Sequence, residues 1–329
     1  MLKKTLIITL LIVFFVSCCY SNENNQKKGF FRIRVDNKWG YIDKTGKIII
    51  DPQYDYAINF SEGLAAIQIA GKLGFIDKNG KIVINPQFDR GSGVFSEGLS
   101  AVKVDNKWGF IDKTGKIKIN PQYDGIMNFS EGLAAVTIAG KLGFIDKNGK
   151  IVINPRFDEG TGVFSEGLSA VEIDRKWGYI DKTGKMVIDA QFKEGSDFSQ
   201  GLALVEDSEY RRGYINKDGE YIIIPQFDRA WSFSNDRARV RYDDKYGYID
   251  KTGTLVILPK FYEAGDFSEG LAAVRIGRNF EYIDKNGKTV INPKFGSARI
   301  FSDGLAMVTL DGNDIYIDKS GKIIFAPTE

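Results

Sequence analysis

The sequence of 329 residues contains no histidine, and its only two cysteines are adjacent, at Cys18 and Cys19. Histidine is the commonest general base and the commonest metal ligand in proteins. Its absence excludes Ser-His-Asp and Cys-His catalysis and most zinc sites. No glycine-rich phosphate loop of the P-loop or dinucleotide type is present. We therefore expect a non-enzymatic protein with no cofactor and no metal, whose body is not stabilised by disulfides.

The chain also lacks an excess of charge of either sign. Its 45 basic and 43 acidic residues give a formal net charge of +2. Lys3 and Lys4 lie in a segment that we expect to be removed, which leaves the mature chain close to neutral. A neutral chain has no general attraction to nucleic acid, so we expect no nucleic-acid partner. The hydrophobic content of 43% is typical of a folded body.

The first residues have the layout of a secretory signal peptide. Lys3 and Lys4 are followed by an apolar run over residues 5–16, then by Ser17, the two cysteines and a polar stretch. The run is shorter than the roughly 20 residues that a transmembrane helix needs. We predict a signal peptide over residues 1–17, a polar tether over residues 18–29 and a repeat domain over residues 30–329.

The string Phe15-Val16-Ser17-Cys18 resembles a bacterial lipobox, although Phe15 stands where that motif usually has Leu. The resemblance implies cleavage before Cys18 and lipidation of Cys18. It also implies an exported protein that is anchored to a membrane at the cell envelope or cell surface. Secretion without a lipid and an uncleaved N-terminal anchor are the alternatives.

The rest of the chain is a repeat, which three features show independently. A Trp-Gly-Tyr/Phe-Ile-Asp string, in two copies without its glycine, recurs every 34 or 35 residues. All eight prolines fall at one repeat position, six residues after a turn glycine, and each of the eight junctions carries Phe-Ser. These features phase nine repeats, of which the first five are the most alike.

Residues 37–47, Asn-Lys-Trp-Gly-Tyr-Ile-Asp-Lys-Thr-Gly-Lys, together with the Phe-Ser-Glu-Gly-Leu-Ala junctions, resemble the bacterial WG (KWG) repeat family. The resemblance covers residues 30–327. It implies a β-rich fold and frequent export, and it implies no common biochemical activity.

The sequence pattern of each repeat predicts three short antiparallel strands. Residues 43–47 have the composition of a hairpin turn with a glycine at positive φ, and strands flank it at residues 38–43 and 47–50. A third strand covers residues 64–69. Pro52 should end the strand that begins at residue 47. Arginines at 237, 239 and 241 share one strand face, so that face should be partly wet. Ala65, Ile67 and Ile69 should then point to the core.

Units of this size must stack to bury a core. Three strands per unit, nine units and no visible split blade favour an open, curved β-solenoid or superhelical ribbon. A closed ring resembling a β-propeller is the alternative, because propellers typically have four-stranded blades and four to eight of them.

Two sets of residues are candidates for binding. Trp39, Trp108 and Trp177 recur every 69 residues and could form an exposed aromatic ladder for sugar or peptide. Leu73 and Leu142 replace them in the intervening repeats, which favours simple packing against the next repeat.

The second set is basic. Arg237, Arg239 and Arg241 lie close in sequence to Trp231 and to further arginines at 211, 212 and 229. Such a patch could bind a phosphate or an acidic glycan. A solvated charged face, partly neutralised by neighbouring aspartates, is the alternative.

The sequence thus favours a scaffold for binding or adhesion that contacts a protein or glycan weakly at many points. A structural spacer of the envelope without a small ligand is the alternative. An enzyme would need a unique acidic pair that breaks the repeat pattern, and we find none. The sequence does not indicate an oligomeric state.

Overall fold

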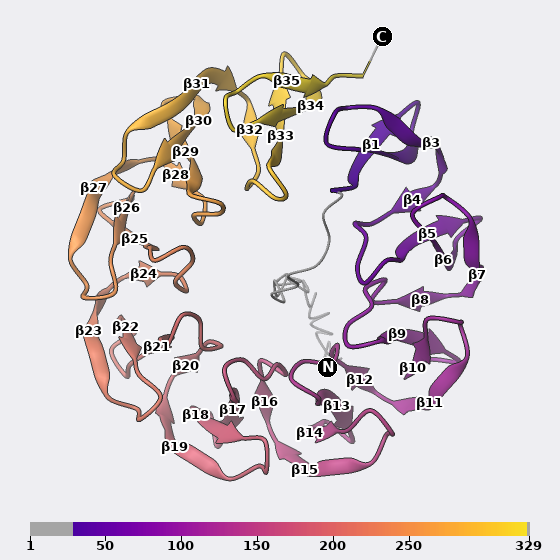
Figure 1. Ribbon diagram of the computed structural model, residues 1–329. Coiled ribbons are helices and arrows are strands. Elements are labelled where there is room, and N and C mark those ends of the chain that lie inside the picture. The colour runs from indigo at the N-terminus through magenta and orange to yellow at the C-terminus, as the bar shows by residue number, and fades with distance from the viewer. Residues whose placement is uncertain (1–28, 328–329) are drawn as a thin grey trace, which may run out of the picture.

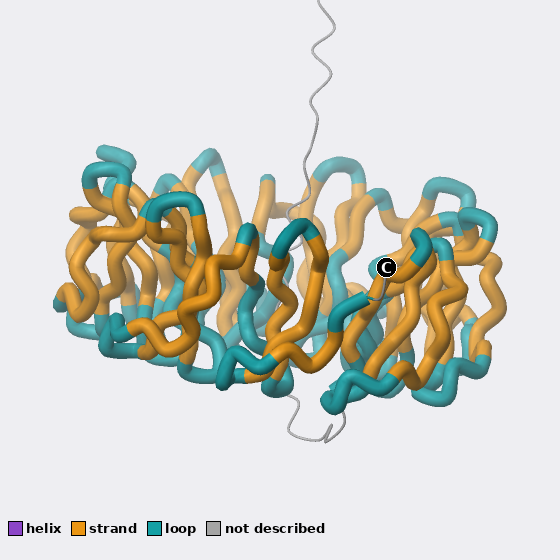
Figure 2. The backbone as a smooth tube through the Cα atoms, turned by 90° about the horizontal axis from the view of Figure 1, so that it is seen from above, coloured by secondary structure: helices purple, strands orange, loops and turns teal. Residues whose placement is uncertain are grey.

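The computed structural model describes residues 29–327, without the side chains of residues 293 and 294. These residues form nine small antiparallel sheets that stand side by side around a common axis (Figure 1). Seen from the edge, the molecule is a flat ring with loops along both rims (Figure 2). We call the sheets blades 1 to 9 in chain order. No helix within residues 29–327 is long and apolar enough to cross a membrane.

The strands of the blades are as follows. Blade 1 contains β1 (Phe31–Val35), β2 (Lys38–Ile42) and β3 (Ile48–Tyr54); blade 2 contains β4 (Tyr56–Ala57), β5 (Ala65–Ile69), β6 (Lys72–Ile76) and β7 (Ile82–Phe88). Blade 3 contains β8 (Arg90–Gly91), β9 (Leu99–Val104), β10 (Lys107–Asp112) and β11 (Ile117–Tyr123); blade 4 contains β12 (Gly125–Ile126), β13 (Ala134–Ile138), β14 (Lys141–Ile145) and β15 (Ile151–Phe157). Blade 5 contains β16 (Glu159–Gly160), β17 (Leu168–Ile173), β18 (Lys176–Asp181) and β19 (Met186–Phe192).

The later blades repeat this order. Blade 6 contains β20 (Glu194–Gly195), β21 (Ala203–Glu206), β22 (Arg212–Ile215) and β23 (Tyr221–Phe227); blade 7 contains β24 (Arg229–Ala230), β25 (Ala238–Tyr242), β26 (Lys245–Ile249) and β27 (Leu255–Phe261). Blade 8 contains β28 (Glu263–Ala264), β29 (Leu271–Ile276), β30 (Asn279–Asp284) and β31 (Thr289–Phe295); blade 9 contains β32 (Ser297–Ala298), β33 (Leu305–Leu310), β34 (Asn313–Asp318) and β35 (Ile323–Phe325).

Eight of the nine sheets have four strands in sequential order, so the expected unit of three strands is incomplete. The additional strand has two residues, as in β4, and lies nearest the axis, whereas the seven-residue strand, as in β7, lies outermost (Figure 1). Two residues such as Tyr56-Ala57 are too few to show an alternating pattern, so this strand could not be predicted from the sequence.

The predicted hairpin turns are confirmed. In blade 1, Asp43 N donates to Lys47 O at 2.9 Å and Gly46 has a φ of 86°. The Asp43 carboxylate accepts hydrogen bonds from Thr45 N at 2.8 Å and from the Thr45 hydroxyl at 2.6 Å. The Thr45 hydroxyl is the first of several hydrogen bonds that hold the pKa of this exposed carboxyl below its ordinary value. These aspartates therefore stabilise the turns.

The expectation that Pro52 ends a strand is wrong, because β3 continues through it to Tyr54. In the pairing of β2 with β3, Trp39 faces Tyr54 and Tyr41 faces Ile50, so the outer strand bulges between these pairs. Pro52 lies in the bulge, where the ladder needs no N–H. A Cβ on Gly40 would lie 2.5 Å from Ile50 O, which explains the glycine after the tryptophan.

The core lies between blades rather than within one. At eight interfaces a buried aromatic residue of one blade packs against the phenylalanine of the next Phe-Ser junction, with ring centroids 4.7 to 5.1 Å apart. The strand next to the two-residue strand, such as β5, therefore has both faces covered by neighbouring blades. Leu64 and Ala66 hold the repeat positions of the arginines at 237 and 239, and both are buried, so the face that was expected to be wet is dry there. Ile69, which was expected in the core, is 39% exposed.

The expected open solenoid is wrong, because blade 9 packs against blade 1 and closes the ring (Figure 1). Leu305 joins Phe31, Ile33 and Ile42 in one apolar cluster, and the Tyr316 hydroxyl donates to Arg32 O at 2.8 Å. Closure uses the same face-to-face packing as the other interfaces and needs no strand shared between the two ends. A nine-bladed propeller can therefore close without the split blade that the sequence lacks.

Candidate functional site

The Phe-Ser junctions form a ladder of hydrogen bonds between neighbouring blades. The Ser130 hydroxyl donates to Phe164 O at 2.6 Å, and the Ser234 hydroxyl donates to Phe267 O at 2.8 Å. The same contact is made by the serines at 96, 165, 199 and 268, with distances of 2.6 to 2.8 Å. At these six junctions the serine satisfies a carbonyl of the next blade, whereas the Ser61 hydroxyl accepts a hydrogen bond from Phe95 N at 2.8 Å, and both contacts are structural.

The glutamate of the junction motif has a second task. Glu62 accepts a hydrogen bond from Gly98 N at 3.0 Å and forms an ion pair with Lys113 at 2.9 Å, and both partners belong to the next blade. Ala65 pairs with Ile76, so the junction turns and the hairpin turns lie at the same end of each sheet. We call this rim of the ring the junction face. The pair recurs as Glu97–Lys147, Glu131–Lys182, Glu166–Lys217 and Glu269–Lys319.

The same charge pattern crosses the closing interface. Asp303 occupies the glutamate position of the last junction, and its carboxylate lies 4.0 Å from Lys44 Nζ in blade 1. Blade 1 therefore follows blade 9 in the ion-pair series just as blade 3 follows blade 2.

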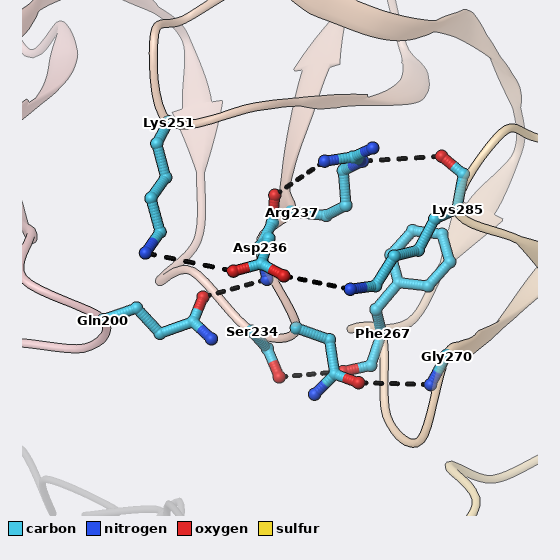
Figure 3. A network of polar contacts seen from close by, with 9 residues as sticks. Gln200, Ser234, Asp236, Arg237, Lys251, Phe267, Gly270 and Lys285 are labelled. Atoms are coloured by element: carbon cyan, nitrogen blue, oxygen red, sulfur yellow. Dashed lines mark hydrogen bonds and ion pairs between the residues drawn. The ribbon is translucent and has the colours of Figure 1, made fainter.

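Two consecutive junctions break this series (Figure 3). Gln200 and Asn235 stand where the other junctions have a carboxylate, and Asp236 stands where they have glycine. Amide oxygens replace the carboxylates as acceptors: Gln200 accepts from Asp236 N at 2.9 Å, and Asn235 accepts from Gly270 N at 3.1 Å. The hairpin lysines of blades 7 and 8, Lys251 and Lys285, both turn to Asp236, at 3.9 and 3.0 Å.

The three tryptophans of the expected ladder are half-buried. Trp108 and Trp177 pack against core clusters that include residues of the next blade, and Trp39 lies beside Tyr56 of blade 2, with ring centroids 6.2 Å apart. Trp39 also has the guanidinium of Arg32 over its ring, 5.0 Å from the centroid. Each indole thus contributes to an interface between blades and keeps part of its surface in solvent.

Blade 7 brings three residues of the expected basic patch, Trp231, Arg239 and Arg241, together with Tyr246. The Arg239 guanidinium lies 4.2 Å from the centre of the Trp231 ring, a cation–π contact, and Arg241 lies 5.9 Å from the centre of the Tyr246 ring. Arg239 also pairs with Asp266 at 3.1 Å. Burial raises the pKa of Asp266, and Arg239 lowers it only in part. Arg237 extends elsewhere, with its Nη1 donating to Asp236 O at 3.0 Å.

The sequence reasoning missed the counterpart of this arrangement in blade 1. Arg32 faces Tyr41 across the ladder as Arg239 faces Tyr248, and each arginine donates to a carbonyl of the next blade, of Ala57 and Ala264. The signal was present, because the Arg-x-Arg pattern of residues 239–241 also occurs at residues 32–34. Arg34 lies 5.8 Å from the centre of the Trp39 ring.

Of the other arginines of the patch, Arg229 faces Arg241 in the pairing of β24 with β25, whereas Arg212 lies apart from them. Arg212 occupies the tryptophan position of blade 6 and pairs with Glu194 at 3.0 Å and Glu206 at 3.1 Å. These side chains line a hollow of about 90 Å³. A second hollow, of about 220 Å³, lies between blades 8 and 9 beside Phe280. Both are smaller than the roughly 300 to 1,000 Å³ of typical ligand pockets. Cys18, the expected lipidation site, lies outside the described residues.

Solved structures with the same architecture include the crystal structure of a eukaryotic initiation factor, which is 12% identical. Its TM-score is 0.64, and the match covers 91% of this chain and 96% of that one. The computationally designed Ika8 protein is also similar, at 12% identity and a TM-score of 0.51, over 81% of this chain and 93% of that chain. At these identities the likeness concerns the fold alone. No curated protein matches the sequence.

The sequence pattern of the family described as "WG containing repeat" matches eight segments of the chain. They are residues 39–72, 74–108, 108–141, 143–177, 177–208, 213–246, 246–280 and 282–313. The matches cover most of the ring and follow the spacing of its blades, so the chain belongs to the WG repeat family.

Proposed function

We propose that this propeller is a structural scaffold of the cell envelope, exported, anchored through a lipid on Cys18 and not an enzyme. In this role it spaces or assembles protein partners and needs no small ligand. The observation that supports the proposal most is where the repeated polar groups are used. The junction serines and glutamates bind the neighbouring blade, so the repeat chemistry serves a stiff ring rather than a pocket.

The anchor and the scaffold role are tested separately. Labelled palmitate should be incorporated into the full chain and not into the Cys18→Ala variant, and globomycin should block processing. Absence of labelling in the unaltered chain would contradict the anchor.

For the scaffold role, cross-linking in intact cells should join the full chain to defined proteins in stoichiometric amounts. A ring that is cross-linked to no protein would contradict the role. A matched sample of the Cys18→Ala variant shows which partners depend on the anchor.

A binding or adhesion role for blade 7 is the second candidate, and the contact of Arg239 with Trp231 favours it. Trp231, Arg239 and Arg241 would supply the contacts in blade 7, and Trp39, Trp108 and Trp177 would supply weaker ones elsewhere. A glycan-array experiment with the unaltered chain and a Trp231→Ala variant tests it. Binding that the substitution does not change would contradict a role of this residue.

A further inference from the structure

The break in the ion-pair series leaves the junction face with an uncompensated charge at blades 7 and 8. At a regular junction one lysine meets one carboxylate, as Lys182 meets Glu131 at 2.9 Å. At the broken junctions Lys251 and Lys285 share Asp236, which is 60% exposed. Lys251 lies 3.9 Å from this carboxylate, farther than the 2.9 to 3.2 Å of the lysines that meet a glutamate.

A third cation adds to the excess. Arg237 stands where the regular junctions have a buried leucine, such as Leu133. Its Nη1 donates to Asp236 O at 3.0 Å and its Nε to Lys285 O at 3.4 Å, which holds the guanidinium between the backbone carbonyls of Asp236 and Lys285 (Figure 3). Asp236 is thus the one junction carboxylate for three cations, with Asp250 of the hairpin also near Arg237, whereas a regular junction has one carboxylate for one lysine.

The regular junctions also show which group fits this place. At Glu131 a single carboxylate meets the ammonium of Lys182 and accepts a hydrogen bond from Gly167 N. At the broken junctions the neutral amides of Gln200 and Asn235 satisfy the backbone donors, and the charge of the lysines is what lacks its usual partner. A carboxylate from outside the chain would restore the balance that the other junctions have.

We propose that Lys251, Lys285 and Arg237 bind an acidic segment of a protein partner through two of its carboxylates. Two consecutive junctions have lost their carboxylate, so two carboxylates a few residues apart in the partner match the two lysines. An acidic segment fits better than a phosphate, because a carboxylate is the group that meets the hairpin lysine at the regular junctions. This inference rests on the proposed scaffold role and names the chemistry of a partner.

The test measures binding of a fluorescein-labelled hexaglutamate peptide to the full chain by fluorescence anisotropy at low ionic strength. The unaltered chain should bind the peptide, and binding should weaken steeply with added salt because the contacts are ionic. The double variant Gln200→Glu/Asn235→Glu restores both internal carboxylates and removes no cation. It should bind at least about tenfold more weakly, a loss that corresponds to about 1.4 kcal/mol.

A matched control separates the site from net charge. Gln53→Glu/Gln122→Glu adds the same two charges to exposed positions on the outer strands β3 and β11, and it should bind the peptide as the unaltered chain does. A third variant, Lys251→Ala/Lys285→Ala, should lose binding. Thermal unfolding of every variant confirms that the ring is folded.

Several outcomes would overturn the inference. They are the absence of binding to the unaltered chain, equal binding by Gln200→Glu/Asn235→Glu, and displacement of the peptide by inorganic phosphate at equal concentration. A failure of the scaffold role is distinguishable from these. If cross-linked partners persist with Gln200→Glu/Asn235→Glu, the scaffold role stands and this site is not its contact. If the peptide binds to the unaltered chain but cells yield no cross-linked partner, the site stands and the scaffold role fails.

Discussion

Blades 2–5 and blades 6–7 have the same strand order and the same bulged pairing, but their junction faces differ in charge. The first group carries Glu62, Glu97, Glu131 and Glu166, each paired with a lysine of the next blade, and the second carries Gln200 and Asn235. The hydrogen bond from the junction serine to the next blade occurs in both groups. The comparison shows that the glycines, the core and the serines define the ring, and that the ion pairs are free to change.

The glycine after the tryptophan position should show the largest effect, and the effect should be alike in both groups. A Cβ on Gly109 in blade 3 would lie 2.4 Å from Ile119 O, and one on Gly247 in blade 7 would lie 2.5 Å from Ile257 O. Backbone on both sides cannot move freely, so Gly109→Ala and Gly247→Ala should each cost about 3 kcal/mol in the free energy of unfolding. Urea unfolding followed by circular dichroism measures this.

Lys118→Ala on the exposed side of β11 is the control, and it should cost less than about 0.5 kcal/mol. A large cost in blade 3 and none in blade 7 would contradict the view that one bulge defines both groups. Blades 8 and 9 lack this glycine. In blade 9, Ile315 takes its place and β35 ends at Phe325, before the bulge position. Blade 8 keeps the bulged pairing with Glu281 there, and the Glu281 carboxylate accepts a hydrogen bond from the Thr289 hydroxyl at 2.8 Å.

The second prediction uses a carboxyl that has replaced an amide. Asp197 precedes the Phe-Ser junction of blade 6, and Asn128 holds the same position in blade 4. Burial raises the pKa of Asp197 above its ordinary value of 3.8, and the Thr161 hydroxyl lowers it only in part. The folded state then holds the proton more tightly than the unfolded state, so this group makes the protein less stable as the pH rises through its folded pKa.

Asp197→Asn should therefore raise the melting temperature at pH 7 and leave it unchanged at pH 3, where both side chains are neutral. Differential scanning fluorimetry across this pH range measures the difference. A variant that melts lower than the unaltered chain at pH 7 would show that the charged form is stabilised in the ring.

The sequence was sufficient for the part of the fold that local chemistry determines. The turn at Asp43 and Gly46, the strand around Trp39 and the length of the repeat follow from residues that lie next to one another. It was not sufficient for closure, which depends on the rotation between blades and on contacts such as Tyr316 with Arg32, far apart in the chain. Pro52 misled because a bulge accepts proline inside a strand.

The candidate site was only partly predictable for a related reason. Arg239, Arg241 and Trp231 were found because their residue types differ from those at the same positions of most other repeats. Lys251 and Lys285 were not found, because these lysines are identical to those of every other repeat. What changed is their partner in the preceding blades, at Gln200 and Asn235, and that pairing is visible only when the blades are placed side by side.

A third prediction concerns the serine ladder, which should be equally important in both groups. Ser130→Ala would leave Phe164 O without its donor, and Ser234→Ala would do the same to Phe267 O. Each should cost about 1 kcal/mol in the free energy of unfolding, as for an ordinary hydrogen bond. Urea unfolding of the two variants tests this, with Ser130→Thr as a control that can keep the bond. A cost confined to Ser130→Ala would mean that the ladder, too, has been relaxed in blade 7.

The ion pairs should show the smallest effect, with opposite signs in the two groups. Glu131→Gln in blade 4 keeps an acceptor for Gly167 N, as Gln200 does for Asp236 N, but removes the charge that faces Lys182. Because these side chains are 31% and 45% exposed, the loss should be only a few tenths of a kcal/mol up to about 1 kcal/mol. Gln200→Glu in blade 6 should gain a similar amount by placing a carboxylate opposite Lys251, as Glu166 lies opposite Lys217. Both differences should vanish in about 1 M salt, where charges are screened within about 3 Å; differences that persist in salt would mean that geometry rather than charge separates the two groups.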